Sequence, residues 1–297
     1  MAASVLCSTE HKTDAATGEY GDLLDLIASS RRLTSLRETL DEARRFLGAP
    51  RPDPAEIRPW RSRAPRRPSE AARRLFAMAR PLKGTLAETY LAGRGITDLR
   101  DCDALRFHPR CWYRGEAIEP QGPHREAWPA LIAAVTDDNG TLTGAHRTWL
   151  NPSGLGKAPV ACPRRAMGRL LGAAVRIGEA DDVMAAGEGL ETMLSLRQAI
   201  PALPVAAALS ANHLAAFRPP KRLRRLYIAH DQDLAGEQAM TRLAIQAQSD
   251  GICVISLSPR TDDFNEDLQT FGAHALKAMI ARQLEPEDVA RFLRAEL

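Results

Sequence analysis

The sequence predicts an α/β protein whose main domain is built on a mostly parallel sheet. Within residues 174–271, short apolar runs alternate with stretches of helical periodicity, the pattern of parallel strands joined by helices. Short acidic motifs follow several of these runs, at the position where ligand sites form on parallel sheets. With 44% apolar residues, the 297-residue chain can bury one large core or two modest ones.

The N-terminal part of the chain is expected to hold helices and a linker. Residues 21–48 carry leucine and isoleucine at helical spacing, so residues 1–48 are predicted to form an N-terminal helical segment. Residues 49–69 contain repeated proline and arginine, which propagate neither a helix nor a central strand, and are interpreted as a linker. The alternative is a basic arm that grips nucleic acid, with Trp60 stacking on a base.

A smaller α+β subdomain is predicted over residues 70–173. Its expected elements are helices at 70–79 and 85–91 and strands at 129–136 and 142–150. The polar turn Asp137-Asp138-Asn139-Gly140 joins the two strands as a hairpin. An open loop with two glycines follows at 151–157.

The main domain, residues 174–271, is expected to contain four strands with helices between them. The strands are predicted at 183–186, 204–209, 226–229 and 252–257, and the helices at 190–199, 212–217 and 235–248. Because the strands are apolar throughout, helices should cover both faces of the sheet. Residues 272–297 are predicted to form two short C-terminal helices.

Acidic residues follow three of these strands. Glu188 comes after the first strand, Asp231 and Asp233 after the third, and the acidic run 262–267 after the fourth. Each acid alone has an ordinary explanation at a helix N-terminus. Together they lie at one sheet edge, where their carboxylates can share a hard cation such as Mg²⁺. The sequence therefore predicts a metal site.

The acidic motifs carry a family resemblance. Gly187-Glu188-Gly189 after one strand, and Asp231-x-Asp233-x-x-Gly236 after another, resemble the Toprim domain of bacterial primases, topoisomerases and some nucleases. The resemblance implies that Glu188 acts in proton transfer or as a ligand, and that Asp231 and Asp233 bind Mg²⁺ (or Mn²⁺). The run Asp263-Phe264-Asn265-Glu266-Asp267 is similar to the ending found in primases of phages and conjugative elements, which implies further ligands at Asp263 and Asp267.

The resemblance extends upstream. Tyr90-Leu91-Ala92-Gly93-Arg94-Gly95-Ile96 and Leu105-Arg106-Phe107-His108-Pro109 resemble the entry to the catalytic core of DnaG-type primases. The strand with Arg147 and the loop that ends at Lys157 are similar to that core's basic strand and lysine loop. Arg147 and Lys157 are thereby implied to contact phosphates of DNA or nucleotide, whereas Arg94 is interpreted as structural.

The sequence also departs from that family. Primases of this type begin with a zinc ribbon of paired cysteines, and this chain has no CxxC pair. Cys7 and His11 are too few for four zinc ligands, so the ribbon is interpreted either as truncated, with residues 1–48 as its remnant, or as supplied elsewhere. Gly154-Leu155-Gly156-Lys157 lacks the pattern of a P-loop, so no helicase motor is expected there.

The leading functional hypothesis is a primase-like nucleotidyltransferase for a mobile element. It would make short RNA primers on single-stranded DNA from ribonucleoside triphosphates, with Mg²⁺ or Mn²⁺, and a replicative helicase is a further candidate partner. The alternatives are a metal-dependent Toprim nuclease and a non-catalytic DNA-binding or helicase-associated primase remnant. Because the chain has no apolar run of about 18 residues and no dense cysteine framework, a cytoplasmic location without a membrane partner is expected.

Overall fold

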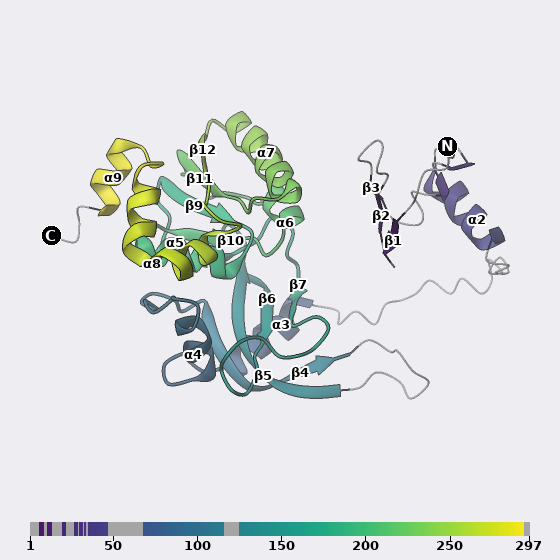
Figure 1. Cartoon of the computed structure of the whole chain (residues 1–297), viewed down its shortest axis with the longest axis horizontal. Coiled ribbons are helices and arrows are strands. Elements are labelled where there is room, and N and C mark those ends of the chain that lie inside the picture. The colour runs from purple at the N-terminus through teal and green to yellow at the C-terminus, as the bar shows by residue number, and fades with distance from the viewer. Residues whose placement is uncertain are drawn as a thin grey trace. The chain divides into compact units, whose positions relative to one another are not determined.

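The computed structural model describes residues 68–115 and 125–293, and parts of the stretch 6–46, namely 6–8, 11–13, 20–21, 27–28, 30–31, 33 and 35–46 (Figure 1). The chain divides into two units, residues 1–63 and 64–297. The first unit holds an antiparallel sheet of β1 (Leu6–Ser8), β2 (His11–Thr13) and β3 (Tyr20–Gly21), and helix α2 (Leu36–Phe46). Helix α2 lies within the range expected to be helical, whereas the strands were not expected. The proposed linker lies outside the described residues except for 68–69.

The N-terminal part of the second unit contains an antiparallel sheet and two helices. Its strands, in spatial order, are β4 (Leu105–Arg114), β5 (Arg125–Thr136), β6 (Leu142–Trp149) and β7 (Arg164–Gly168). Helices α3 (Pro68–Met78) and α4 (Leu86–Ala92) precede it. Both helices and the β5–β6 hairpin match the expected elements, while β4 and β7 were not predicted as strands.

The main domain contains a five-stranded sheet. Its strands are β8 (Val175–Ile177), β9 (Val183–Gly187), β10 (Val205–Ala207), β11 (Arg225–Ala229) and β12 (Cys253–Leu257), in the order β12-β11-β9-β10-β8. The four predicted strands are present and mutually parallel. The fifth strand, β8, pairs antiparallel with β10 and was not predicted. The α/β class with a mostly parallel sheet is therefore confirmed.

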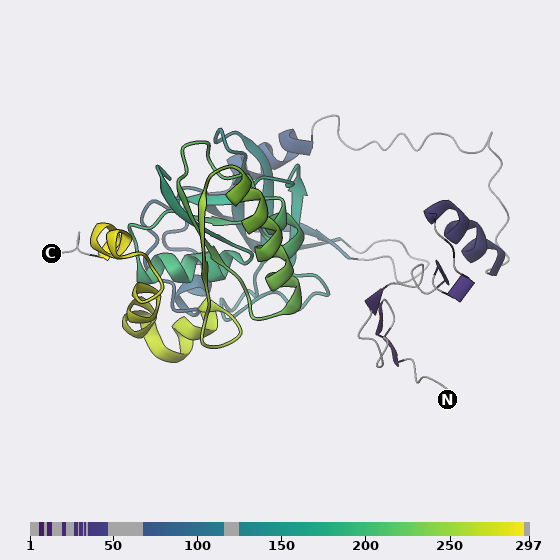
Figure 2. The same ribbon diagram turned by 90° about the horizontal axis from the view of Figure 1, so that it is seen from above.

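Helices cover both faces of this sheet (Figure 1, Figure 2). Alternate residues of β9 point to opposite sides: Val183 and Ala185 belong to one apolar core, Met184 and Ala186 to another. Helices α5 (Leu190–Ala199) and α8 (Phe264–Ala281) pack on the first side. Helices α6 (Ala211–Ala215) and α7 (Leu234–Ser249) pack on the second. Burial on both faces explains why the strands are apolar throughout.

The last helix, α9 (Pro286–Leu293), is anchored to the sheet by a buried acid. Asp288 accepts hydrogen bonds of 2.6 Å from both Arg225 Nη1 and the Tyr227 hydroxyl. Gly272, with φ of 80°, kinks α8 on the way to this helix. The described C-terminal residues therefore pack on the main domain.

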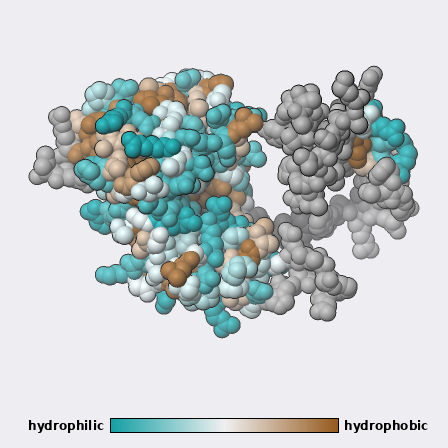
Figure 3. Space-filling view, in the orientation of Figure 1, coloured by the Kyte–Doolittle hydropathy of each residue, from teal (hydrophilic) through white to brown (hydrophobic). Residues whose placement is uncertain are grey.

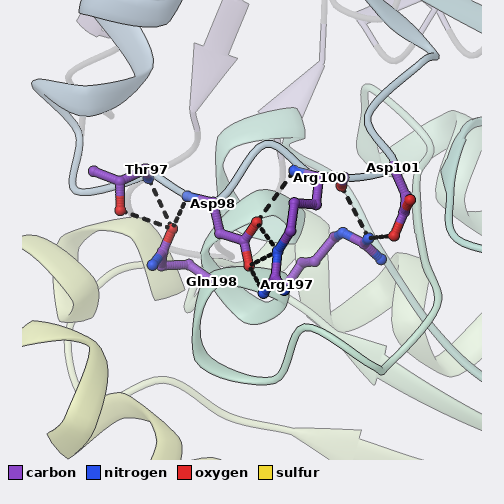
Figure 4. A network of polar contacts seen from close by, with 6 residues as sticks. All are labelled: Thr97, Asp98, Arg100, Asp101, Arg197 and Gln198. Atoms are coloured by element: carbon purple, nitrogen blue, oxygen red, sulfur yellow. Dashed lines mark hydrogen bonds and ion pairs between the residues drawn. The ribbon is translucent and has the colours of Figure 1, made fainter.

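One apolar core joins the antiparallel subdomain to the main domain. It contains Tyr90 of α4, Phe107 of β4 and Leu131 of β5 together with residues of α5, α8 and the parallel sheet. Polar contacts add to this interface, because the Gln198 side chain accepts hydrogen bonds from the amides of Thr97 and Asp98 (Figure 4). Residues 64–297 are thus a single compact unit built from two sheets.

Figure 3 shows small hydrophobic patches separated by hydrophilic side chains on the visible face of the described residues. Within the described part of the chain, none of the helices combines the length and apolarity that crossing a bilayer requires.

Candidate active site

Glu188 stands where β9 turns into α5, between two glycines. A Cβ atom on Gly187 would lie 2.5 Å from the sulfur of Met193 and 2.6 Å from the carbonyl oxygen of Ala229, so no side chain fits there. Gly189 is the N-cap of α5. Because residue 187 lacks a side chain, β9 and β11 end side by side, which brings Glu188 to the loop that follows β11.

Asp231 and Asp233 lie in that loop. Asp233 is the N-cap of α7, and its Oδ1 accepts a hydrogen bond of 2.7 Å from the amide of Gly236. A Cβ atom on Gly236 would lie 2.7 Å from the carbonyl oxygen of Asp231 and 3.2 Å from Oε1 of Glu188. The glycine of the Asp-x-Asp-x-x-Gly motif therefore leaves the space through which the Glu188 carboxylate approaches this loop.

The carboxylates at this sheet edge interact electrostatically. Burial, together with the charges of Asp231 and Asp233, raises the pKa of Glu188 to about 7. Burial also raises the pKa of Asp231 to about 6, with contributions from the charges of Asp263 and Asp233. Four carboxyl groups from three loops therefore interact with one another: Glu188, Asp231, Asp233 and Asp263. Because like charges repel, ionisation of all four is unfavourable without a nearby cation.

The unpartnered oxygens of this cluster fit a divalent cation. Oε1 of Glu188 and Oδ1 of Asp231 are buried and have no hydrogen-bond donor. Hard cations such as Mg²⁺ bind carboxylate oxygens and keep several waters, so two protein ligands with acids beside them are a suitable donor set. Among the residues that the structure describes, no three His, Cys, Asp or Glu side chains are arranged to hold a metal by themselves. The fit therefore rests on these two oxygens.

Asp263 and Asp267 occupy different positions. Asp263 is the N-cap of α8, where its Oδ1 accepts hydrogen bonds from the amides of Asn265 and Glu266 at 2.7 and 2.8 Å. It lies near enough to the cluster for its charge to raise the pKa of Asp231. Asp267 is 1% exposed, and both its oxygens accept hydrogen bonds from the 260–261 loop, at 2.8 to 3.0 Å. The structure thus brings Asp263 to the cluster and ties Asp267 to a loop.

Lys157 and Arg147 lie in separate places. The Lys157 ammonium is 3.8 Å from Oε1 of Glu191 in the first turn of α5. Burial lowers the pKa of Lys157, although Glu191 opposes that shift. The Arg147 guanidinium lies 4.8 Å over the ring of Trp149. On β6 the adjacent residue, His146, points to the other face of the sheet and lines a cavity beside the acids.

That cavity has a volume of about 580 Å³. Its lining includes His146, Arg164, Glu188, Glu191, Ser210, His213 and Asp231. Arg164 was not predicted as a site residue; its positive charge lowers the pKa values of both Asp231 and Glu191. Burial lowers the pKa of His146 to about 4, so the imidazole is neutral at physiological pH. The cavity lining thus contains both carboxylate and arginine residues.

A strained loop forms part of the cavity lining. Leu209 has φ of 78°, which is unusual for a residue other than glycine, and its amide donates a 2.7 Å hydrogen bond to the carbonyl oxygen of Glu188. The hydroxyl of Ser210 caps α6 and lies 3.0 Å from Nδ1 of His213. Ser210 and His213 were not predicted as site residues either, because nothing in the sequence marks Leu209 as a turn.

A polar network connects the motifs of the two sheets. The Tyr90 hydroxyl donates a 2.7 Å hydrogen bond to Glu191, next to Lys157. Arg94 lies 5.4 Å over the Tyr90 ring and donates a 2.8 Å hydrogen bond to Oδ1 of Asn265. Burial opposes ionisation of Glu191, yet Lys157 and the tyrosine keep its pKa below the usual range. Arg94 thus has the structural role expected from the sequence.

Two family models match the chain. Residues 183–274 match the Toprim domain, which confirms the resemblance drawn from Glu188, Asp231 and Asp233. Residues 66–177 match a domain of unknown function (DUF7146). The comparison with curated proteins gave no match.

Solved structures of primases resemble the fold. The Aquifex aeolicus primase, in a structure of its zinc-binding and RNA polymerase domains, matches with a TM-score of 0.51 and 16% identity, over 96% of this chain and 76% of that one. A DNA primase domain from Pseudomonas aeruginosa matches with a TM-score of 0.49 and 17% identity, over 72% of this chain and 78% of that one. The match to the Aquifex aeolicus primase, with a TM-score of 0.51 at 16% identity, shows that this chain shares its fold.

Proposed function

We propose that this chain, a Toprim protein with the fold of a primase catalytic core, is a nucleotidyltransferase that makes RNA primers on single-stranded DNA. The observation that carries the proposal is the pair of buried, unpartnered oxygens on Glu188 and Asp231 at the Toprim sheet edge. A cavity of about 580 Å³, which Glu188, Asp231 and Arg164 line, offers space and charge for a polyphosphate.

Each residue of the site has a distinct part. Glu188 and Asp231 would hold Mg²⁺ or Mn²⁺ through their unpartnered oxygens, with the Asp233 carboxylate beside them; the ion, when bound, activates the attacking hydroxyl and neutralises phosphate charge. Glu188, whose pKa is about 7 in the metal-free site, can hold a proton there near neutral pH, which a bound cation would displace. Arg164 and Lys157 bind and orient phosphate oxygens. Asp267, whose oxygens are occupied, holds the loop at 260–261 instead of serving as a ligand.

The direct test is primer synthesis by an Asp231→Asn variant. The change keeps the shape of the side chain and removes its charge, so Mg²⁺-dependent synthesis of RNA primers on single-stranded DNA should be lost. Asp250→Asn, at the exposed C-terminal end of α7, is the matched control and should leave synthesis unchanged. Full synthesis by Asp231→Asn would refute the proposed site.

The same assay separates the alternatives. Labelled DNA that is shortened without nucleotides indicates a nuclease, and metal-independent DNA binding with neither reaction indicates a non-catalytic protein.

The Asp263-Phe264-Asn265-Glu266-Asp267 ending supports a role in mobile-element replication, which would place the protein in the cytoplasm with a replicative helicase as a further partner. Arg147, which stacks on Trp149 away from the cavity, is left out of the proposed phosphate contacts.

A further inference from the structure

The outer end of β4 carries an exposed aromatic side chain between two arginines. Trp112 is 65% exposed, although tryptophan is usually largely buried. Along the strand, exposed Arg110, Trp112 and Arg114 alternate with buried Cys111 and Tyr113. Alternate residues of a strand share a face, so the Trp112 indole and the Arg114 guanidinium project on one side, and exposed Arg110 lies beside them in the bulge between His108 and Cys111.

The strand beneath this surface is firmly held. The Tyr113 ring meets the Trp149 ring edge-to-face at 5.0 Å, and the Trp149 indole donates a 3.1 Å hydrogen bond to the carbonyl oxygen of Cys111. Arg165 donates a 2.7 Å hydrogen bond to the carbonyl oxygen of Arg114. The arginine–tryptophan surface, Arg110, Trp112 and Arg114, is therefore preorganised, which lowers the entropic cost of binding.

The cavity lies farther along the same face of the sheet, beyond buried core residues such as Leu131. Trp112 lies opposite Ala127 on β5, and Leu131, four residues farther along β5, lies opposite Thr148 on β6. Thr148 and His146 share that face, and His146 lines the cavity. The separation between Ala127 and the partner of His146, six residues along β5, is about 20 Å at the usual rise per residue.

We propose that the arginine–tryptophan surface binds single-stranded nucleic acid and anchors a template about 20 Å from the cavity lining. Guanidinium groups bind phosphates, and an exposed indole stacks on a base of any identity. The inference rests on the proposed function only for the role of the bound strand as a template. A second protein seated here would have to desolvate two guanidinium groups, so a polyanion is the better partner.

The test is equilibrium binding of a fluorescent oligothymidylate to the full chain, without Mg²⁺ or nucleotides, at several salt concentrations. Trp112→Ala should weaken binding about 5- to 150-fold, the range expected for loss of one base–aromatic stack. Trp112→Phe should recover most of the affinity. Arg110→Gln and Arg114→Gln should each lower the slope of log affinity against log salt by about 0.7.

Control variants lie on α7, where Ile245 is 65% exposed and Arg242 is also exposed. Ile245→Ala and Arg242→Gln should bind as the wild type does. Unchanged affinity and slope in the Trp112 and arginine variants would overturn the proposal. Self-association that Trp112→Ala abolishes, with DNA binding intact, would show a contact between copies instead. Asp231→Asn should still bind, so failure of catalysis and failure of this surface are distinguishable.

Discussion

At the scale of single residues, Glu188 and Asp231 keep protons that the unfolded chain would release. Their pKa values of about 7 and 6 exceed the ordinary 4.5 and 3.8. Between about pH 4 and 7 the folded state therefore binds more protons than the unfolded state, and the free energy of unfolding falls as pH rises through that window. We expect the metal-free protein to lose thermal stability over this range. A cation among the carboxylates removes the cause of the loss, so Mg²⁺ should raise the melting temperature more at about pH 8 than at about pH 5.

Thermal unfolding followed by circular dichroism, with and without Mg²⁺, measures this effect. Glu188→Gln combined with Asp231→Asn should flatten the pH dependence and remove the response to Mg²⁺. The expectation fails if Mg²⁺ stabilises the double variant as much as the wild type, or stabilises the wild type equally at both pH values.

The Tyr90–Glu191 hydrogen bond gives a second residue-scale prediction. Glu191 is 7% exposed, and its partners are the Tyr90 hydroxyl at 2.7 Å and Lys157 at 3.8 Å. Tyr90→Phe removes a hydrogen bond to a buried charge, so the free energy of unfolding should fall by about 1.5–3 kcal/mol in urea titrations. Glu191→Gln in the same background shows whether the buried charge is the cause, because the neutral side chain should restore part of the loss. A loss below about 0.5 kcal/mol would mean that water replaces the hydroxyl.

At the scale of elements, two of the acids also begin helices. Asp233 caps α7 and Asp263 caps α8. Capping and metal binding can be separated, because serine caps a helix but carries no charge. Asp263→Ala should lower the free energy of unfolding by about 0.5–2 kcal/mol, whereas Asp263→Ser should retain most of it. If Asp263 also supports the cation, both variants lose primer synthesis to a similar extent. If Asp263→Ser instead keeps both stability and primer synthesis while Asp263→Ala loses both, Asp263 acts only as a helix cap.

The elements that the sequence predicted are those with a strong pattern. Strands β9, β10 and β11 are short apolar runs buried on both faces, and α5 was predicted over its observed range, Leu190–Ala199. Strand β7 was missed because Arg164 and Arg165 give it no apolar alternation. Strand β4 was missed because Pro109 and a bulge interrupt its pairing.

The site residues that could be predicted are those whose position follows from the order of the parallel strands. Glu188 and Asp231 follow neighbouring parallel strands, so their meeting follows from the topology rule. Which of His146 and Arg147 faces the acids depends on the pairing register, which the local sequence does not determine. The loop that occupies the Asp267 oxygens is likewise a tertiary feature.

At the scale of the whole molecule, one of the apolar cores in residues 64–297 spans both sheets. Leu131 on β5 is 1% exposed and belongs to the same cluster as Met193 of α5 and Phe264 of α8. The face of the antiparallel sheet that carries Leu131 is therefore covered by the main domain, whereas its other face forms a separate core with α3. Neither part can unfold without exposing apolar surface of the other, so one cooperative transition is expected.

Two spectroscopic probes can test this cooperativity, because they report on different sheets. The tryptophans of the described chain, Trp112, Trp128 and Trp149, all lie on β4 to β6, whereas most helical residues lie in the main domain. Tryptophan fluorescence and far-ultraviolet circular dichroism should therefore give the same unfolding midpoint in urea. Leu131→Ala should lower both midpoints together, with a loss of about 2–5 kcal/mol. If fluorescence alone shifts, the antiparallel sheet unfolds by itself; the polar links from Tyr90 to Glu191 and from Gln198 to Thr97 would then hold together two separately folded parts.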